Sequence, residues 1–228
     1  GLRTGVGVDF WGYKEWYGYD YSATTPWDVS QISGGTVEYS HAFGKITCGI
    51  KTGTKKTFKR NKKSYKRMSE HIGLIPLVMI SPYDTDLISG GSENRRKFID
   101  SVISQYDKNY LDSLIRYNNT LQQRNAMLKA DTEPNQSIID IYDEIMALEG
   151  EKIFNYRKDF INDFTPIFNK YHKLISQESE NVGIEYISHC QRGALIDILK
   201  QSRVADRAVG YSLHGIHKDD ICFNLDSY

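Results

Sequence analysis

Apolar residues recur with helical spacing through the middle of the chain. From Ser92 onward they lie three and four positions apart, which predicts an amphipathic helix with Ser92 as its cap. A second helix is predicted over about 109–129, because its seam has the alternating spacing of a helix packed lengthwise on another. The first helix is expected to bury Phe98, Ile99, Val102, Ile103 and Tyr106, and the second Leu111, Leu114, Asn118, Leu121, Asn125 and Leu128.

A third helix is predicted from about Ser137, after a loop over 131–136. Thr165-Pro166 should kink or restart this helix, since proline has no N–H to donate and crowds the preceding turn. The second and third helices together predict an antiparallel arm. The expected apolar stripe of the third helix comprises Ile138, Ile141, Ile145 and Leu148, then Ile153, Phe160 and Phe164, and beyond the proline Phe168, Tyr171 and Ile175.

Strand-like patterns lie on both sides of the arm. Two short runs with a hairpin tip at Asn61-Lys62 come first, because asparagine tolerates positive φ. Expected strands cover 45–50, 57–60, 75–81, 182–188 and 221–225, with a further helix over 194–209. The return to β structure indicates that the arm is inserted into one domain. The fold class is therefore α+β, with an antiparallel coiled-coil-like helical insertion and short strands.

Composition suits a soluble globular protein. The chain has 228 residues, of which 39% are hydrophobic and 25% charged, and its formal net charge is zero. Three widely separated cysteines indicate reduced thiols in a cytosol rather than a disulfide framework. No apolar run reaches the ~18 residues that a membrane span needs, so no membrane association is expected. Residues 131–151 are acidic.

The charges are unevenly spread, and residues 51–67 hold nine lysines and arginines and no acid. Cations on a hairpin can neutralise phosphates, and the interleaved Phe58 and Tyr65 could stack on bases. Such contacts carry no sequence specificity. The alternative is a solvated hairpin tip. The candidate DNA-binding residues are Lys55, Lys56, Lys59, Arg60, Lys62 and Lys63.

Arg95 and Arg96 stand in the first turn of the first predicted helix. Free N–H groups at a helix start and two guanidinium groups could grip a phosphate. The alternative is structural, because Arg96 and Asp100 are four residues apart and can pair on one helical face. Both interpretations remain open on the sequence.

Two further polar clusters invite similar alternatives. Gln123, Arg124 and Asn125 could form a buried polar seam between the arm helices or a docking site for a partner. His217, Lys218, Asp219 and Asp220 contain groups that can bind a divalent ion. No second histidine or cysteine stands at ligand spacing, so no metal site and no catalytic residue are assigned. An enzyme of another class built on this cluster is the remote alternative.

The order of these motifs resembles the RecF family, which has an SMC-like ATPase head with a helical lid. The resemblance rests on the string from Gly90 to Asp100, on Tyr117 to Asn125, and on Gly215 to Asp220, with Ser92, Ile216 and Lys218 departing from the family pattern. It implies an unmatched segment over 1–35, part of an ATPase head over 36–90, the lid over 91–208, and a strand returning to the head over 209–228.

The resemblance also implies a function. RecF proteins bind ATP and Mg²⁺, act as slow DNA-dependent ATPases, dimerise on single-stranded or gapped DNA, and help RecO and RecR to load RecA in the cytoplasm, at the nucleoid. Phosphoryl transfer of this kind needs a P-loop. The sequence has no Gly-x-x-x-x-Gly-Lys-Ser/Thr string, so the chain by itself is expected not to hydrolyse ATP.

Two alternatives stay open. The chain could be a helical protein–protein interaction module without nucleic-acid binding. Residues 10–21, rich in glycine, tyrosine and tryptophan, follow neither the helical nor the strand period. One hypothesis for the unmatched 1–35 segment is a shifted reading frame, and an added tag or a chance terminus are the others.

Overall fold

The computed structural model describes residues 13–17, 34–41, 44–51, 57–75, 82–177 and 181–225. The chain divides into two compact units, one ending at Ile75 and the other beginning at Pro76. None of the helices in the described ranges combines the length and the apolar character needed to cross a membrane.

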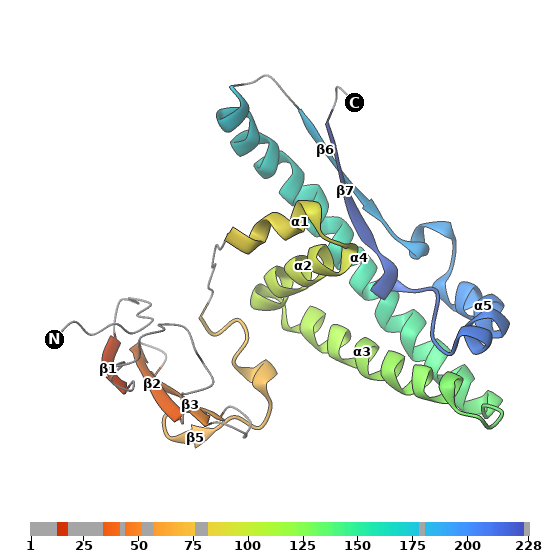
Figure 1. Ribbon diagram of the computed structural model, residues 1–228, viewed down its shortest axis with the longest axis horizontal. Coiled ribbons are helices and arrows are strands. Elements are labelled where there is room, and N and C mark those ends of the chain that lie inside the picture. The colour runs from red at the N-terminus through yellow and green to blue at the C-terminus, as the bar shows by residue number, and fades with distance from the viewer. Residues whose placement is uncertain are drawn as a thin grey trace, which may run out of the picture. The chain divides into compact units, whose positions relative to one another are not determined.

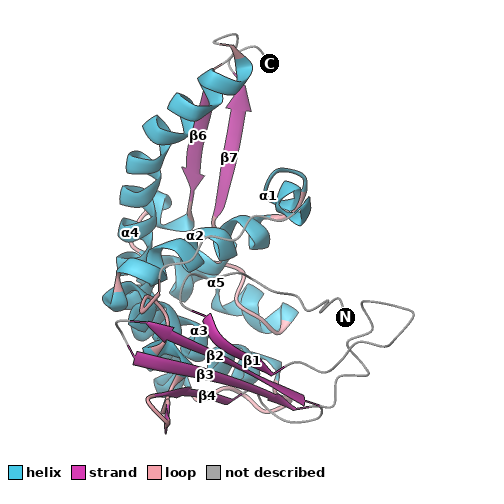
Figure 2. Ribbon diagram, turned by 90° about the vertical axis from the view of Figure 1, so that its left-hand side faces the viewer, coloured by secondary structure: helices cyan, strands magenta, loops and turns pink. Residues whose placement is uncertain are grey.

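The first unit is an antiparallel sheet with strand order β1-β2-β3-β4-β5 (Figure 2). Its strands are β1 (Tyr13–Tyr17), β2 (Gly34–His41), β3 (Gly44–Lys51), β4 (Thr57–Arg60) and β5 (Lys63–Ser64), followed by the short helix η2 (Met68–Glu70). The predicted strands over 45–50 and 57–60 are confirmed. β1 is a correction, because the sequence predicts no regular element there. The strand predicted over 75–81 falls, except for Ile75, outside the described residues.

The second unit is mainly helical. Its elements are η3 (Pro82–Thr85), α1 (Asp86–Ser89), α2 (Ser92–Tyr106), α3 (Lys108–Lys129), α4 (Gln136–Ser176), β6 (Val182–Ile187), η4 (His189–Arg192), α5 (Leu195–Val209), η5 (Ile216–Lys218) and β7 (Asp220–Leu225). α3 and α4 run side by side in opposite directions, and β6 and β7 lie along the C-terminal half of α4 (Figure 1). The predicted antiparallel arm is therefore confirmed.

Short polar side chains set the ends of the arm helices. Asp107 accepts the backbone N–H groups of Asn109 and Tyr110, and Asn135 accepts those of Ser137 and Ile138. Both are N-caps that satisfy donors with no partner inside the helix. The predicted Ser92 cap is wrong, because Gly91 occupies the cap position of α2 and Ser92 is already helical.

The buried face of α3 only partly coincides with the predicted seam. Tyr110, Ser113, Tyr117, Thr120 and Arg124 are buried, whereas Asn118 is exposed. Leu111 and Leu128 from the predicted seam are buried as well. Leu114 and Leu121 are half-buried and pack against the core, so the predicted seam is confirmed for its leucines and wrong for Asn118. The seam missed the polar side chains that this face also buries.

In the N-terminal half of α4, most of the predicted stripe is exposed. Ile138, Ile141 and Leu148 are 39%, 52% and 58% exposed. Ile139, Asp143, Met146, Ala147 and Gly150 form the buried face there instead. Ile153 of the predicted stripe is buried, as expected. The helix thus has apolar residues on two sides in this half, and only one side packs on α3 and α5.

α4 continues through Pro166 without a break. Thr165 donates its hydroxyl to the carbonyl of Ile161 at 2.7 Å. On either side of the proline, Phe160, Phe164 and Phe168 stack in sequence along the helix, with ring centroids 5.5 and 5.8 Å apart. Phe168 also contacts Phe223 of β7. Packing on both sides of the proline offsets the lost backbone hydrogen bond, so the expected restart does not occur.

Gly150 lets α4 approach its neighbours closely. A Cβ there would stand 2.6 Å from Cδ2 of Leu195 and 3.3 Å from Cε2 of Tyr117, and both of these residues are fully buried. β7 packs on α2, so the end of the described chain returns to the helix that precedes the arm. The core of the unit includes Ile99, Ile103, Tyr110, Tyr117, Met146, Ile153, Ile161, Leu195, Leu199, Ile216 and Ile221.

Replacing a buried and an exposed isoleucine by alanine tests which side of α4 is buried. Ile153→Ala removes a side chain that is 0% exposed and should lower the free energy of unfolding by about 2–4 kcal/mol. Ile141→Ala, at a position 52% exposed, should change it by less than about 1 kcal/mol. Urea denaturation of both variants measures the difference, and equal losses would contradict this register.

Candidate functional site

The basic hairpin β4–β5 is the first candidate site. Asn61 and Lys62 have φ values of 50° and 68°, which suits the two-residue turn of a hairpin, and the predicted tip is confirmed. Asn61 accepts the backbone N–H of Lys45 at 2.9 Å and donates its own N–H to the carbonyl of Lys45 at 2.8 Å. The tip is thereby fixed to the start of β3. Lys45, exposed beside it, is a cation that the sequence analysis missed.

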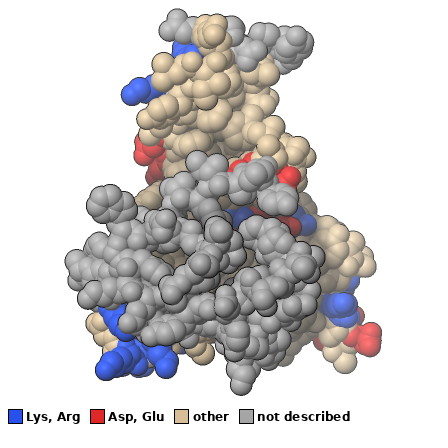
Figure 3. Space-filling model, turned by 60° about the vertical axis from the view of Figure 1, so that its left-hand side comes forward, with Lys and Arg blue, Asp and Glu red and all other residues tan. Residues whose placement is uncertain are grey.

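The predicted DNA-binding residues lie on more than one side of this hairpin. Arg60 pairs with Lys63 across the strands and Lys59 pairs with Ser64, so Lys59 faces away from the other two cations. Lys59, Lys62 and Lys63 are exposed and Arg60 is half-buried, whereas Lys55 and Lys56 lie outside the described residues. Lys66 and Arg67 extend the exposed cations. Figure 3 shows lysine and arginine side chains gathered at the lower left of one face.

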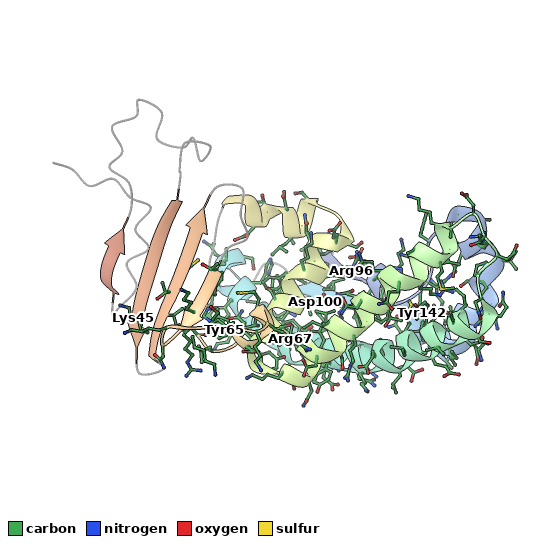
Figure 4. The ribbon with its side chains drawn as sticks, turned by 90° about the horizontal axis from the view of Figure 1, so that it is seen from below. Lys45, Tyr65, Arg67, Arg96, Asp100 and Tyr142 are labelled. Atoms are coloured by element: carbon green, nitrogen blue, oxygen red, sulfur yellow. The ribbon has the colours of Figure 1, made fainter. Side chains whose placement is uncertain are left out.

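The two aromatic residues of the hairpin pack inward. Phe58 and Tyr65 are half-buried, and their ring centroids lie 5.7 and 5.3 Å from that of His71. His71 Nδ1 also lies 3.1 Å from the Tyr65 hydroxyl, and burial together with the charge of Arg60 lowers the pKa of His71. The hairpin surface therefore presents cations, while its aromatic rings hold it against η2. Lys45, Tyr65 and Arg67 are labelled in Figure 4.

Arg95 is committed to contacts inside the second unit. Its Nε and Nη2 donate to the two carboxylate oxygens of Asp220 at 2.7 and 3.1 Å. Its Nη1 donates to the carbonyls of Leu87 and Gly90. This bidentate pair fastens the first turn of α2 to the start of β7. All three nitrogens of the Arg95 guanidinium therefore donate to groups inside the second unit, which favours the structural interpretation.

Arg96 and Asp100 do not have the partners expected from their spacing. Arg96 donates to the backbone carbonyl of Asp219 at 2.5 Å, and Asp100 pairs with Arg157 of α4. Figure 4 shows Arg96 and Asp100 on α2. Burial and the charge of Arg157 lower the pKa of Arg96. The predicted Arg96–Asp100 pair is thus replaced by contacts that tie α2 to α4 and to the end of η5.

Arg157 is the centre of a buried ion-pair node. Its side chain is 2% exposed and donates to both oxygens of Asp100, to Oδ2 of Asp219 at 2.9 Å, and to the carbonyl of Ile216 at 2.8 Å. The hydroxyls of Tyr110 and Tyr186 donate to Asp100 and Asp219 in turn. The Arg157 node thereby joins α2, α3, α4, β6 and η5. Arg157 is not among the residues predicted from sequence motifs.

Arg124 forms a second node nearer the tip of the arm. Its fully buried side chain donates to Asp143 at 2.7 Å, to Asp206 at 2.8 Å and to the Ser212 hydroxyl at 2.7 Å. Asn125 accepts the backbone N–H and the hydroxyl of Ser212. The Arg124 node thus joins α3, α4, α5 and the segment after α5. Arg124 therefore lies in a buried polar contact between the arm helices. Asn125 bonds to Ser212 outside the arm, and Gln123 is exposed.

Two further arginines that the sequence analysis missed complete this end of the arm. Arg203 of α5 pairs with both Asp143 and Asp140 of α4. Arg207 donates to the carbonyls of Leu128, Ala130 and Thr132, which follow the last turn of α3. A cation at a helix C-terminus satisfies carbonyls that have no partner in the helix. Arginines at these sites are indistinguishable by pattern from surface arginines.

His217 also forms hydrogen bonds inside the second unit. Its Nε2 lies 3.1 Å from the carbonyl of Ser212, which can only accept, so Nε2 carries the proton and Nδ1 accepts from the Tyr117 hydroxyl at 2.9 Å. Gly215 permits this contact, because it has φ +132° and a Cβ there would stand 2.2 Å from the Tyr117 oxygen. Lys218 is exposed and lies over the ring of Tyr211.

Neither the Arg95–Asp100 cluster nor the His217–Asp220 cluster forms a nucleotide or metal site. The guanidinium of Arg95 is turned to a carboxylate and to carbonyls rather than outward to a phosphate. Asp219 and Asp220 pair with arginines. Within the described ranges, no three side chains of histidine, cysteine, aspartate or glutamate gather as a metal would require. With these partners, Arg95, Asp219 and Asp220 do not fit ATP or Mg²⁺.

An antiparallel helical arm followed by a short antiparallel strand pair is found in SMC/ABC-type ATPase heads that carry a helical lid. A structure described as the recombination mediator protein RecF with ATP in the RecFOR pathway matches this chain with a TM-score of 0.78 at 26% identity, covering 93% of this chain and 62% of that one. The fold class predicted from the sequence is confirmed.

Sequence comparison gives the particular family. The DNA replication and repair protein RecF of Phocaeicola vulgatus is 52% identical over 184 residues, which is 81% of this chain and 50% of that protein, and that of Bacteroides fragilis is 53% identical over the same span. A comparison with models of known families finds no match. The chain belongs to the RecF family of DNA replication and repair proteins, and it spans about half the length of these relatives.

The Arg124 node predicts a large effect of one substitution. Arg124→Met leaves the buried carboxylates of Asp143 and Asp206 without this partner, so the free energy of unfolding should fall by about 3–5 kcal/mol. Lys97→Met is the matched control, since it breaks an exposed pair with Glu93 and should change the free energy of unfolding far less. Urea denaturation measures both. A small loss for Arg124→Met would show that the node does not hold the arm.

His217 predicts a pH dependence of stability. Burial lowers its pKa from 6.5 to about 4, so the unfolded chain binds the proton more readily than the folded one. The stabilising contribution is complete above pH 6.5 and is lost as the pH falls toward 4, by up to about 3 kcal/mol. His217→Gln should flatten this part of the curve of unfolding free energy against pH. Parallel curves for the two proteins would contradict the assignment.

Proposed function

We propose that this chain acts in DNA repair by holding the phosphate backbone of single-stranded or gapped DNA on the β4–β5 hairpin. The observation that supports this most directly is the set of exposed cations on this hairpin and on the residues just after it. Lys59, Lys62, Lys63, Lys66 and Arg67 are all exposed, and residues 51–67 contain no acid to neutralise them. A dense group of exposed cations attracts a polyanion and releases its counterions on binding.

The rigidity of the hairpin supports the same proposal. Asn61 fixes the tip to β3, and the Phe58–His71–Tyr65 contacts hold its base. Cations displayed on a fixed turn lose less conformational freedom on binding than the same cations on a loose chain. Because they contact phosphates and not bases, the expected binding is insensitive to sequence.

The remaining family properties are also proposals for this chain. Curated relatives are named as DNA replication and repair proteins, and a structural neighbour is described as RecF with ATP in the RecFOR pathway. We propose that ATP with Mg²⁺, a second copy of the chain, and RecO- and RecR-like mediators that load RecA are its cofactors and partners, in the cytoplasm at the nucleoid. The nucleotide site in this proposal is not built from the arginine-bearing motifs of the second unit.

The rival function is a helical protein–protein interaction module. The extensive polar fastening of the arm suits a rigid docking element as well as it suits an ATPase lid. The two functions differ in the response of DNA binding to salt, because a module without nucleic-acid contacts has no counterions to release.

A salt titration tests the hairpin. Binding of the whole chain to a fluorescently labelled gapped duplex, followed by anisotropy from 50 to 300 mM salt, should weaken steeply. The variant Lys59→Gln, Lys62→Gln, Lys63→Gln should reduce the slope of log K against log salt by about 2–3, since each lost phosphate contact removes about 0.7–0.9.

The control removes the same number of charges elsewhere. Lys108, Lys129 and Lys200 are exposed residues of α3 and α5, and their replacement by glutamine should leave the slope unchanged. Equal effects of the two triple variants on the slope would show that binding depends on total charge and not on the hairpin. Absence of salt-dependent binding in the parent chain would favour the interaction module.

A further inference from the structure

The N-terminal half of α4 carries an apolar stripe on its outer side. The stripe consists of Ile138, Ile141, Ile145 and Leu148, of which the first two and the last are exposed and Ile145 is half-buried. Their spacing of three, four and three residues is that of a helix seam that packs on another helix. The ten steps from Ile138 to Leu148, at about 1.5 Å each, make the stripe about 15 Å long.

The fold of the second unit does not use this stripe. The side of α4 that packs on α3 and α5 is formed by Ile139, Met146 and Ile153, which are at most 3% exposed. Isolated apolar side chains on a surface are ordinary, but four in one register on one helix make a contiguous patch. The patch therefore has the spacing of an interface without a partner among the described elements of its own unit.

Charge along the stripe indicates the chemistry of that partner. Glu144 and Glu151 are exposed along one border, and the half-buried Tyr142, labelled in Figure 4, lies along the other. The sequence has seven acids and no lysine or arginine over 131–151. Arg203 and Arg116 reach Asp140, Asp143 and Glu149 from neighbouring helices. Lys152, the first cation after this range on α4, also pairs with Glu149. Those pairs leave the Glu144–Glu151 border acidic.

We propose that this stripe is a docking surface for a basic amphipathic helix of a partner protein. The apolar ridge of the partner would pack on the isoleucines and Leu148, and its lysines or arginines would lie along Glu144 and Glu151. A second copy of the stripe is a poor occupant. Antiparallel self-pairing sets the two acidic borders against each other, and parallel self-pairing sets each acidic border against the Tyr142 border, which has no lysine or arginine over 131–151. The inference is independent of DNA binding by the hairpin.

Two synthetic helical peptides test the proposal with the whole chain. Both have leucines at heptad spacing, and one has lysines and the other glutamates at the flanking positions. Anisotropy should show the lysine peptide binding at least tenfold more tightly. The double variant Ile141→Asn, Leu148→Asn should weaken that binding tenfold or more. The double variant Glu144→Lys, Glu151→Lys should reverse the preference between the peptides.

Val204→Asn is the matched control, because Val204 is an apolar residue 84% exposed on α5 and outside the stripe. It should leave peptide binding unchanged, and thermal melts of all variants confirm that each is folded. Equal binding of both peptides, or equal effects of the stripe and control variants, would overturn the proposal. Self-association of the parent chain that the stripe variants abolish, measured by sedimentation, would assign the surface to a second copy and overturn it as well.

Discussion

A guanidinium group removed from water must find acceptors for its N–H groups, and Arg157 meets this requirement only when several elements are in place together. Its carboxylate partners come from α2 and from the residue before β7, and its carbonyl partner comes from η5. Tyr110 and Tyr186 donate further hydrogen bonds to these two carboxylates. An unpaired buried charge is costly, so these elements must pack together for Arg157 to have its partners.

The Arg124 node imposes the same requirement at the other end of the arm. α5 and the segment behind it are held against α3 and α4 by Asp206 and Ser212 rather than by apolar contact alone. Polar fastening of this kind is directional, so it selects one register of the helices. It also explains the family resemblance physically. The strings that carry the resemblance supply Asp100 and Asp219 to the Arg157 node and Arg124 to the other node. Their neighbours Gln123 and Lys218 are exposed.

Sequence patterns were sufficient for the existence and order of the helices, the tip at Asn61-Lys62 and the strand pair after the arm. They failed on the buried faces of α3 and α4, because Arg124, Asp143 and Arg157 occupy positions where periodicity expects leucine or isoleucine. The stripe through Ile141 followed hydrophobicity to the exposed side of α4, and the seam on α3 included the exposed Asn118 but missed Arg124. For the candidate site, the motif arginines were found, but their partners were not, since a lone arginine on a helix has no pattern that marks it as buried.

The unbroken course of α4 past Pro166 has a mechanical consequence. At 41 residues the helix is about 60 Å long. Phe160, Phe164, Phe168 and the strand pair lie toward one end, and the Arg124 node lies toward the other. Pivoting such a helix by 5° about its strand end would sweep its far end through about 5 Å. A small tilt imposed where β6 and β7 grip the helix is thereby magnified into a displacement that a bound protein at the arm could sense.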